Sequence, residues 1–209
     1  MSLAYPQDLS GKMFTFPLET SWAHVRITTS RQHLAATTVC FRYFTDLTKE
    51  FGMFSMATSS HQNSFTIFKK ARTDHFQVFV RDALAEYYGQ EYKINTWQSL
   101  CSTWDSSTGL TQLWLNGIPS ARKFITTSEI NGPIIIVLGQ EQDSHGGGFD
   151  IKQSFVGMTA DLHMWDYALS PVQILNYSHN ITVPEGNLLR WGSLEFQKTS
   201  RVEIEDAMF

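Results

Sequence analysis

The chain has 209 residues, enough for one domain with a sizeable hydrophobic core. Hydrophobic residues make up 42%, and six Trp, seven Tyr and fifteen Phe are far too many for a disordered chain. Sixteen Lys and Arg against twenty Asp and Glu give a formal net charge of -4, which argues against broad nucleic-acid binding, because phosphate contacts need clustered basic residues. No apolar run approaches the length needed to span a bilayer, so we do not expect an integral membrane protein.

Most of the chain consists of short segments in which apolar and polar residues alternate, separated by polar turns. The segments expected to form strands are residues 13–16, 24–28, 38–44, 51–56, 65–68, 76–80, 98–104, 110–115, 134–138 and 157–164. Asn116 and Gly117 follow one of them, and an Asn-Gly pair there is the strongest short signal for a β-hairpin. Because a single sheet of so many strands would leave one face and two edges exposed, we expect an all-β, two-sheet antiparallel jelly-roll sandwich.

A polar loop at residues 139–153 follows the apolar run at 134–138. It contains three carboxylates, two side-chain amides after Glu141, and three successive glycines at 146–148. Calcium takes about six to eight oxygen ligands in flexible geometry, whereas zinc prefers nitrogen and sulfur, so the loop suits calcium. Its spacing does not match the helix-loop-helix calcium pattern. Acidic, glycine-rich turns are also common as plain solvated connections, and composition leaves both interpretations open.

One segment departs from the strand pattern. Ser170 is a suitable N-cap residue and Pro171 suits the first helical position, which predicts a short α-helix as far as Ser178. The tail at residues 196–209 is mixed in charge, and we expect a final strand followed by a loose end.

The two cysteines, Cys40 and Cys101, each lie in a strand-like segment. They are compatible with two buried thiols or with one disulfide, and composition does not decide between these. Glycosylation sequons begin at Asn176 and Asn180, overlap the predicted helix, and are only weak indications of a secreted protein.

A family resemblance is carried by residues 99–106, which read Ser-Leu-Cys-Ser-Thr-Trp-Asp-Ser. They match the pentraxin signature H-x-C-x-[ST]-W-x-[ST] at every fixed position except the first, where Ser99 replaces histidine. Further agreement lies at residues 38–41, 138–143, 164–166 and 170–171. The chain thus resembles the short pentraxins, the family of C-reactive protein and serum amyloid P component. The resemblance implies a single pentraxin domain over 1–209 and a disulfide between Cys40 and Cys101, hence an oxidising, extracellular setting.

The resemblance also implies two calcium ions per subunit. The ligands that it indicates are Asn63, Glu141, the backbone carbonyl of Gln142, Asp143, Asp150 and Gln153. Gln62 stands where the family usually has aspartate, so one negative charge is lost and the first ion should bind more weakly. Asp150 stands where glutamate is common, and its shorter side chain would misplace the second ion.

Phe68 matches the position whose ring lines the family's ligand pocket, where a choline methyl group could rest against it. A plain core phenylalanine is the alternative. The acidic residue that complements choline's positive charge has no clear counterpart, because an ungapped alignment places Ala83 there with Asp82 beside it. Phosphocholine, phosphoethanolamine and carbohydrate therefore all remain open as ligands.

The function implied by the resemblance is that of a secreted, calcium-dependent, lectin-like pattern-recognition protein of innate immunity and the acute phase. Such a protein binds phosphate-bearing or acidic groups, including polysaccharides, on microbial or damaged-cell surfaces and recruits complement or phagocyte receptors. The chain would form a homo-oligomer, either a pentamer, as is usual in the family, or a trimer. Several sites on one assembly would multiply the modest affinity of each site for its ligand. The alternative is a β-sandwich adhesion or assembly protein with a structural or degraded calcium site, and Gln62 favours it.

No catalytic pattern supports an enzyme. The densest acidic run outside the calcium loop, residues 203–206, lies in the tail, where exposed charges are the better account. The seven histidines form no H-E-x-x-H motif and the chain lacks G-x-S-x-G. His145 is the one histidine within the calcium loop.

Overall fold

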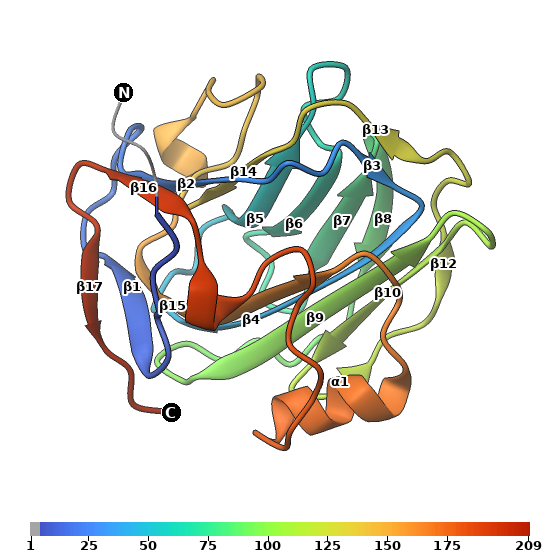
Figure 1. Cartoon of the computed structure of the whole chain (residues 1–209). Helices are drawn as coiled ribbons and strands as arrows, with labels where there is room; N and C mark the ends of the chain where they lie inside the picture. Colours follow the sequence, from blue (N-terminus) through green and yellow to red (C-terminus); the bar gives the residue numbers. More distant parts are fainter. Residues whose placement is uncertain (1–4) are drawn as a thin grey trace.

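The structure is a computed structural model that describes residues 5–209, so the first four residues of the predicted domain lie outside the described range. Two antiparallel sheets pack face to face as a sandwich (Figure 1), which confirms the predicted all-β architecture. A separate two-stranded ribbon pairs β3 (His33–Leu34) with β13 (Ile130–Asn131). Among residues 5–209, no helix is both long and apolar enough to cross a bilayer.

The first sheet has eight strands in the order β11-β10-β9-β4-β15-β1-β17, with β12 also paired to β10. Its members are β1 (Lys12–Phe16), β4 (Ala36–Phe44), β9 (Gln98–Asp105), β10 (Leu110–Leu115), β11 (Ile118–Pro119), β12 (Lys123–Phe124), β15 (Gly157–Trp165) and β17 (Glu203–Asp206). The predicted hairpin joins β10 to β11, where Asn116 and Gly117 have φ angles of 54° and 76°. These are the left-handed conformations that a two-residue hairpin turn requires.

The second sheet has seven strands in the order β16-β2-β14-β5-β6-β7-β8. Its members are β2 (His24–Thr28), β5 (Phe51–Ala57), β6 (Phe65–Lys69), β7 (Phe76–Val80), β8 (Ala83–Tyr87), β14 (Ile135–Leu138) and β16 (Phe196–Thr199). Alternate residues of both sheets point inward and form one aromatic-rich core, which includes Phe14, Phe41, Phe54, Phe65 and Phe76. All ten predicted strands are present, with ends within two residues of the predicted ones.

The helix α1 (Pro171–Ser178) is also confirmed, and it has a complete capping box. The backbone N–H of Gln173 donates to Ser170 Oγ, and the backbone N–H of Ser170 donates to Gln173 Oε1 at 2.9 Å. Two short 3₁₀ helices, η1 (Ile151–Gln153) and η2 (Trp191–Ser193), complete the fold.

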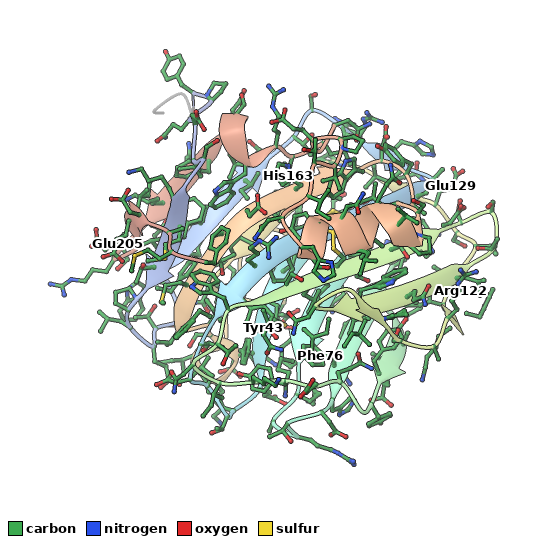
Figure 2. The ribbon with its side chains drawn as sticks, turned by 90° about the horizontal axis from the view of Figure 1, so that it is seen from below. Tyr43, Phe76, Arg122, Glu129, His163 and Glu205 are labelled. Carbon is green, nitrogen blue, oxygen red and sulfur yellow. A yellow bond between two sulfur atoms is a disulfide. The ribbon has the colours of Figure 1, made fainter. Side chains whose placement is uncertain are left out.

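Helix α1 covers the outer face of the eight-stranded sheet (Figure 2) and encloses a second small core. That core contains Trp114, Trp165 and Tyr177 together with Cys40 and Cys101. The two cysteines face each other across β4 and β9 and form the predicted disulfide, with an S–S distance of 2.01 Å. The alternative of two buried thiols is therefore excluded.

The tail differs from its prediction. Instead of one strand and a loose end, residues 196–209 contain β16, which pairs with β2, and β17, which pairs with β1. Each strand closes one edge of a different sheet. In β17 the charged side chains are exposed, and Glu205 and Asp206 contact Thr15 and Lys12 of the neighbouring strand. The acidic run is therefore an exposed edge strand, a common protection against edge-to-edge association.

Candidate calcium and ligand site

The loop at residues 139–153 lies on the side of the sandwich opposite α1, as the gold segment of Figure 1 shows. It begins at Gly139, whose φ of 92° is a left-handed conformation; a Cβ there would lie 2.4 Å from the ring of Phe16. The chain then turns back across β5. Only glycine allows this tight turn against the core.

Gln142 fixes the loop to the sheet. Its side chain is fully buried, and its Nε2 donates to the backbone carbonyls of Ser55 at 3.0 Å and Ile135 at 3.1 Å. Its Oε1 accepts a hydrogen bond from Gly146 N–H at 2.8 Å. The Gln142 side chain therefore holds the loop in place. The calcium ligand predicted from the sequence is the backbone carbonyl of Gln142, and that role remains a prediction.

Glu141 lies directly over β5 at Gly52. A Cβ on Gly52 would be 2.8 Å from Glu141 Cβ, so the glycine makes room for the glutamate. Gly52 pairs with Phe68 of β6, which places Glu141 next to that ring. The space that Glu141 occupies beside Phe68 therefore depends on the pairing of β5 with β6.

The carboxylate of Glu141 has no charge-neutralising partner in the described part of the chain. The residue is 6% exposed, and no hydrogen bond or ion pair reaches its carboxylate from residues 5–209. Burial, followed by the neighbouring charge of Asp143, raises the pKa of Glu141 to about 8. Such a pair of carboxylates favours a bound cation.

A cavity of about 170 Å³ connects several of the predicted site residues. Its walls are formed by Asn63, Phe68, Lys70, Gln77, Phe79, Glu141, Asp143 and Gln153. Two of its amide oxygens, Asn63 Oδ1 and Gln153 Oε1, are buried without a hydrogen-bond partner. Buried polar atoms are rarely left unpaired, so these two oxygens need a partner that the described chain does not supply.

These donors fit calcium. Two carboxylates and two free amide oxygens on one small cavity are the hard oxygen ligands that this ion takes. No group of three or more His, Cys, Asp or Glu side chains within residues 5–209 is arranged to hold a metal ion. The fit therefore depends on the amides of Asn63 and Gln153.

Asn63 is held in place by the turn between β7 and β8. Its N–H donates to Asp82 Oδ1 at 2.9 Å, and its carbonyl accepts from Asp82 N–H at 3.0 Å. Asp82, exposed Gln62 and His145 line a separate open depression on the other side of Asn63 and Asp143. Gln62 therefore does not line the cavity that holds Glu141.

Asp150 also lies outside that cavity. It caps η1, where its Oδ1 accepts from Lys152 N–H at 2.9 Å, and its side chain is exposed. Its predicted role as a calcium ligand remains a prediction.

Phe68 is 5% exposed and forms part of the cavity wall rather than of the core between the sheets. The sequence analysis did not assign the other wall residues, Lys70, Gln77 and Phe79, to a site. The period-two alternation of β6 does contain a signal for Lys70, because residues two apart in a strand share one face. Gly52, Gln77 and Phe79 become recognisable only from the pairing of β5, β6 and β7.

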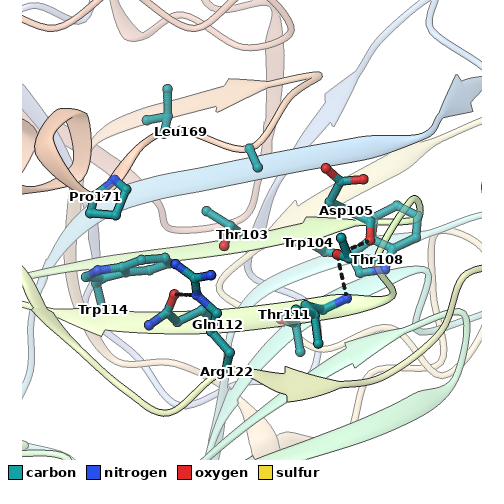
Figure 3. Close-up of a pocket in the computed structure, with 12 residues that line it drawn as sticks. Thr103, Trp104, Asp105, Thr108, Thr111, Gln112, Trp114, Arg122, Leu169 and Pro171 are labelled. Carbon is teal, nitrogen blue, oxygen red and sulfur yellow. Dashed lines mark hydrogen bonds between the residues drawn. The ribbon is translucent and has the colours of Figure 1, made fainter.

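A second cavity, of about 240 Å³, lies on the other sheet between β9, β10 and the start of α1 (Figure 3). Arg122 Nε donates to Gln112 Oε1 at 3.1 Å, and Asp105 Oδ1 accepts from Ser107 N–H at 2.8 Å. Its charged side chains are thus already partnered within the chain. We assign no site to it.

Comparison with known proteins identifies the family. The model of the Pentaxin family matches residues 12–206. Serum amyloid P-component of Mus musculus is 35% identical over 199 residues, which cover 94% of this chain and 88% of that protein. C-reactive protein of Sus scrofa is 33% identical over 213 residues, which cover 100% of this chain and 94% of that protein. A heptameric SAP-like pentraxin from Limulus polyphemus superposes with a TM-score of 0.85 at 26% identity, covering 96% of this chain and 97% of that chain. The resemblance found in the sequence is confirmed, and the chain belongs to the pentraxin family.

Proposed function

We propose that this pentraxin is a secreted pattern-recognition protein that binds calcium on the outer face of the seven-stranded sheet and holds phosphate-bearing or acidic ligands there. One observation carries the proposal: two buried, unpaired amide oxygens share a cavity with two carboxylates, one of them buried. We further propose that the chain forms one pentraxin domain.

The residues of the cavity would act together in this role. Glu141, Asp143, Asn63 and Gln153 would hold calcium, and Asp150 with the Gln142 carbonyl would serve a second ion. Bound calcium supplies positive charge for an anionic ligand. Gln142 and Gly52 fix the position of Glu141, and the rings of Phe68 and Phe79 form an apolar wall beside the calcium ligands.

A homo-oligomer would make weak sites effective. Several copies with their sites on one face would raise the apparent affinity for a repetitive surface by avidity. The similar Limulus protein is heptameric, and we propose a ring for this chain as well. Light scattering on the purified protein measures the number of copies. Complement or phagocyte receptors would then bind the opposite face.

Calorimetric titration of calcium into chelator-treated protein tests the site. The double variant Glu141→Ala with Asp143→Ala should lose calcium uptake. Glu203→Ala with Glu205→Ala is the matched control, because it removes two exposed carboxylates from β17 on the other sheet. Absence of uptake by the natural protein at millimolar calcium, or full uptake by the site variant, contradicts the proposal.

A binding assay with immobilised phosphoethanolamine and phosphocholine tests the ligand. We expect retention in calcium and release by chelator. The alternative, an adhesion or assembly protein with a structural or degraded calcium site, is favoured by the neutral, exposed Gln62 and by Asp150 outside the cavity. It predicts no calcium-dependent retention of any anionic ligand.

A further inference from the structure

We propose that the cavity beside the calcium ligands selects ligands with a second anionic group, and that Lys70 binds this group. The inference rests on the proposed function and adds the ligand class: a phosphate monoester or carboxylate that carries another acidic group nearby, rather than one that carries a quaternary ammonium.

The position of Lys70 is the first observation. Phe68 and Lys70 are two residues apart, so both side chains lie on the outer face of the sheet. Lys70 Nζ is 5.4 Å from the centroid of the Phe68 ring, and both residues line the cavity that contains Glu141. The protein's own ammonium group thus occupies the face of the aromatic ring against which a ligand cation would rest.

The second observation is the charge around the cavity. Only two carboxylates of the described chain line it, Glu141 and Asp143, and the proposed function assigns both to calcium. Asp82 is bonded to the backbone of Asn63 and lines the neighbouring depression instead. Glu86 accepts from Gln77 Nε2 at 3.0 Å and from Tyr88 Oη at 3.1 Å. No free carboxylate of residues 5–209 remains in the wall to complement a ligand cation.

Lys70 itself retains binding capacity. Its ammonium has three N–H donors, and the hydrogen bond that the structure shows goes to Glu50. Both side chains of this pair are about one third exposed, and Glu50 does not line the cavity. A ligand anion in the cavity could therefore bind Lys70 without displacing Glu50, whereas a ligand cation there would be repelled.

Two matched probes differ only at the proposed point of contact. 3-Phosphoglycerate has a carboxylate where glycerol 3-phosphate has a hydroxymethyl group. In calorimetry at a saturating, buffered concentration of free calcium, we expect 3-phosphoglycerate to bind about tenfold more tightly than glycerol 3-phosphate. A difference of that size is what one charge-assisted hydrogen bond contributes to affinity. Phosphocholine should bind more weakly than glycerol 3-phosphate.

Three variants test the role of Lys70. At saturating calcium, Lys70→Gln should reduce the tenfold preference to less than about twofold. Glu50→Gln should increase the preference, because it removes the competing carboxylate. Lys12→Gln is the matched control: this lysine also pairs with a carboxylate, Asp206, but lies on the other sheet. It should behave like the natural protein.

The outcomes separate the two proposals. Equal binding of the two matched probes by the natural protein, or an undiminished preference in a folded Lys70→Gln variant, overturns this inference and leaves calcium-dependent binding intact. Tighter binding of phosphocholine than of 3-phosphoglycerate also overturns it, whatever the variants do. If no probe binds in calcium, the proposed function fails and this inference fails with it.

Discussion

Within residues 5–209, each outer face of the sandwich buries an ionisable side chain, and the two side chains differ in whether the chain supplies a partner. Arg42, beneath the segment that includes α1, and Glu141, on the opposite sheet, are both 6% exposed. Arg42 donates to Tyr177 O at 2.6 Å, to Asn180 Oδ1 at 2.7 Å and to Asp161 Oδ2 at 3.3 Å. Glu141 has no partner in the described chain. A buried charge is normally paired, so the ionised form of Glu141 needs a cationic partner from outside the described chain.

Arg42 and Glu141 differ because different segments cover the two sheets. The segment over the eight-stranded sheet supplies acceptors for Arg42, namely the Tyr177 carbonyl and the Asn180 amide oxygen. The loop over the seven-stranded sheet instead brings Asp143 and the Gln153 oxygen, both hydrogen-bond acceptors, toward the Glu141 carboxyl group. One face therefore pairs its buried charge within the chain, whereas the other leaves oxygen atoms unpaired, as the proposed calcium site requires.

Removal of the disulfide should have the largest effect on the face that pairs its buried charge. The variant Cys40→Ala with Cys101→Ala opens a loop whose ends are 61 positions apart, which on the chain-entropy model is worth about 4 kcal/mol of unfolding free energy. Urea denaturation measures the loss. Calcium affinity should not change, because the disulfide lies in the core under α1. A parallel loss of calcium affinity would show that the two faces are not independent.

Replacement of the paired charge should come next. Arg42→Met leaves Asp161, Asn180 and the Tyr177 carbonyl without their donor, and we expect a loss of about 3 kcal/mol in unfolding free energy. The control is Arg31→Met, which breaks a more exposed pair with Asp166 and should cost less than about 1 kcal/mol. Similar losses in the two variants would contradict the importance of burial.

Replacement of the unpaired Glu141 carboxyl group should have the opposite effect on the stability of the calcium-free protein. Glu141→Gln removes a buried carboxylate that has no partner, so the calcium-free variant should be as stable as the natural protein or more stable. Calcium affinity should fall at least about tenfold, equivalent to roughly 1.4 kcal/mol. Thermal unfolding with and without calcium measures both effects. Glu129→Gln, at an exposed pair with His33, is the control and should leave calcium affinity unchanged.

The sequence predicts much of the fold because its signals are local. Alternation along each strand, and the N-cap Ser170 followed by Pro171, act within a few residues, and both agree with the structure. The pairing of β17 was missed because its residues carry almost no apolar alternation and depend on the free edge of β1.

The candidate site is less visible in the sequence. The oxygen donors of the loop were identified from their residue types and from the family resemblance. Gly52 and Lys70 were not, because their roles arise from the register that pairs Gly52 with Phe68 and from the fold of the loop over β5. Asp150 was placed with the other ligands by alignment, yet the cap of η1 holds it outside the cavity.

The smallest expected effect concerns a partly exposed carboxylate that has two hydrogen-bond donors. Asp166 accepts from Asn187 Nδ2 at 2.6 Å and from Arg31 Nη1 at 2.8 Å, and these contacts, Asn187 first, hold the pKa of Asp166 below its usual value of 3.8. A lowered folded-state pKa contributes stability above the unfolded pKa, and this is lost as pH falls through the folded pKa. Asp166→Asn should therefore lower the unfolding free energy by well under about 1 kcal/mol near neutral pH, because solvent screens the pair.

Urea denaturation of the Asp166→Asn variant and the natural protein, at neutral pH and near pH ~2, should show this difference vanish in acid. A difference that persists in acid would mean that the carboxylate acts through packing rather than through its charge. Charge pairing would then no longer explain the contrast between a partnered carboxylate such as Asp166 and an unpartnered one such as Glu141.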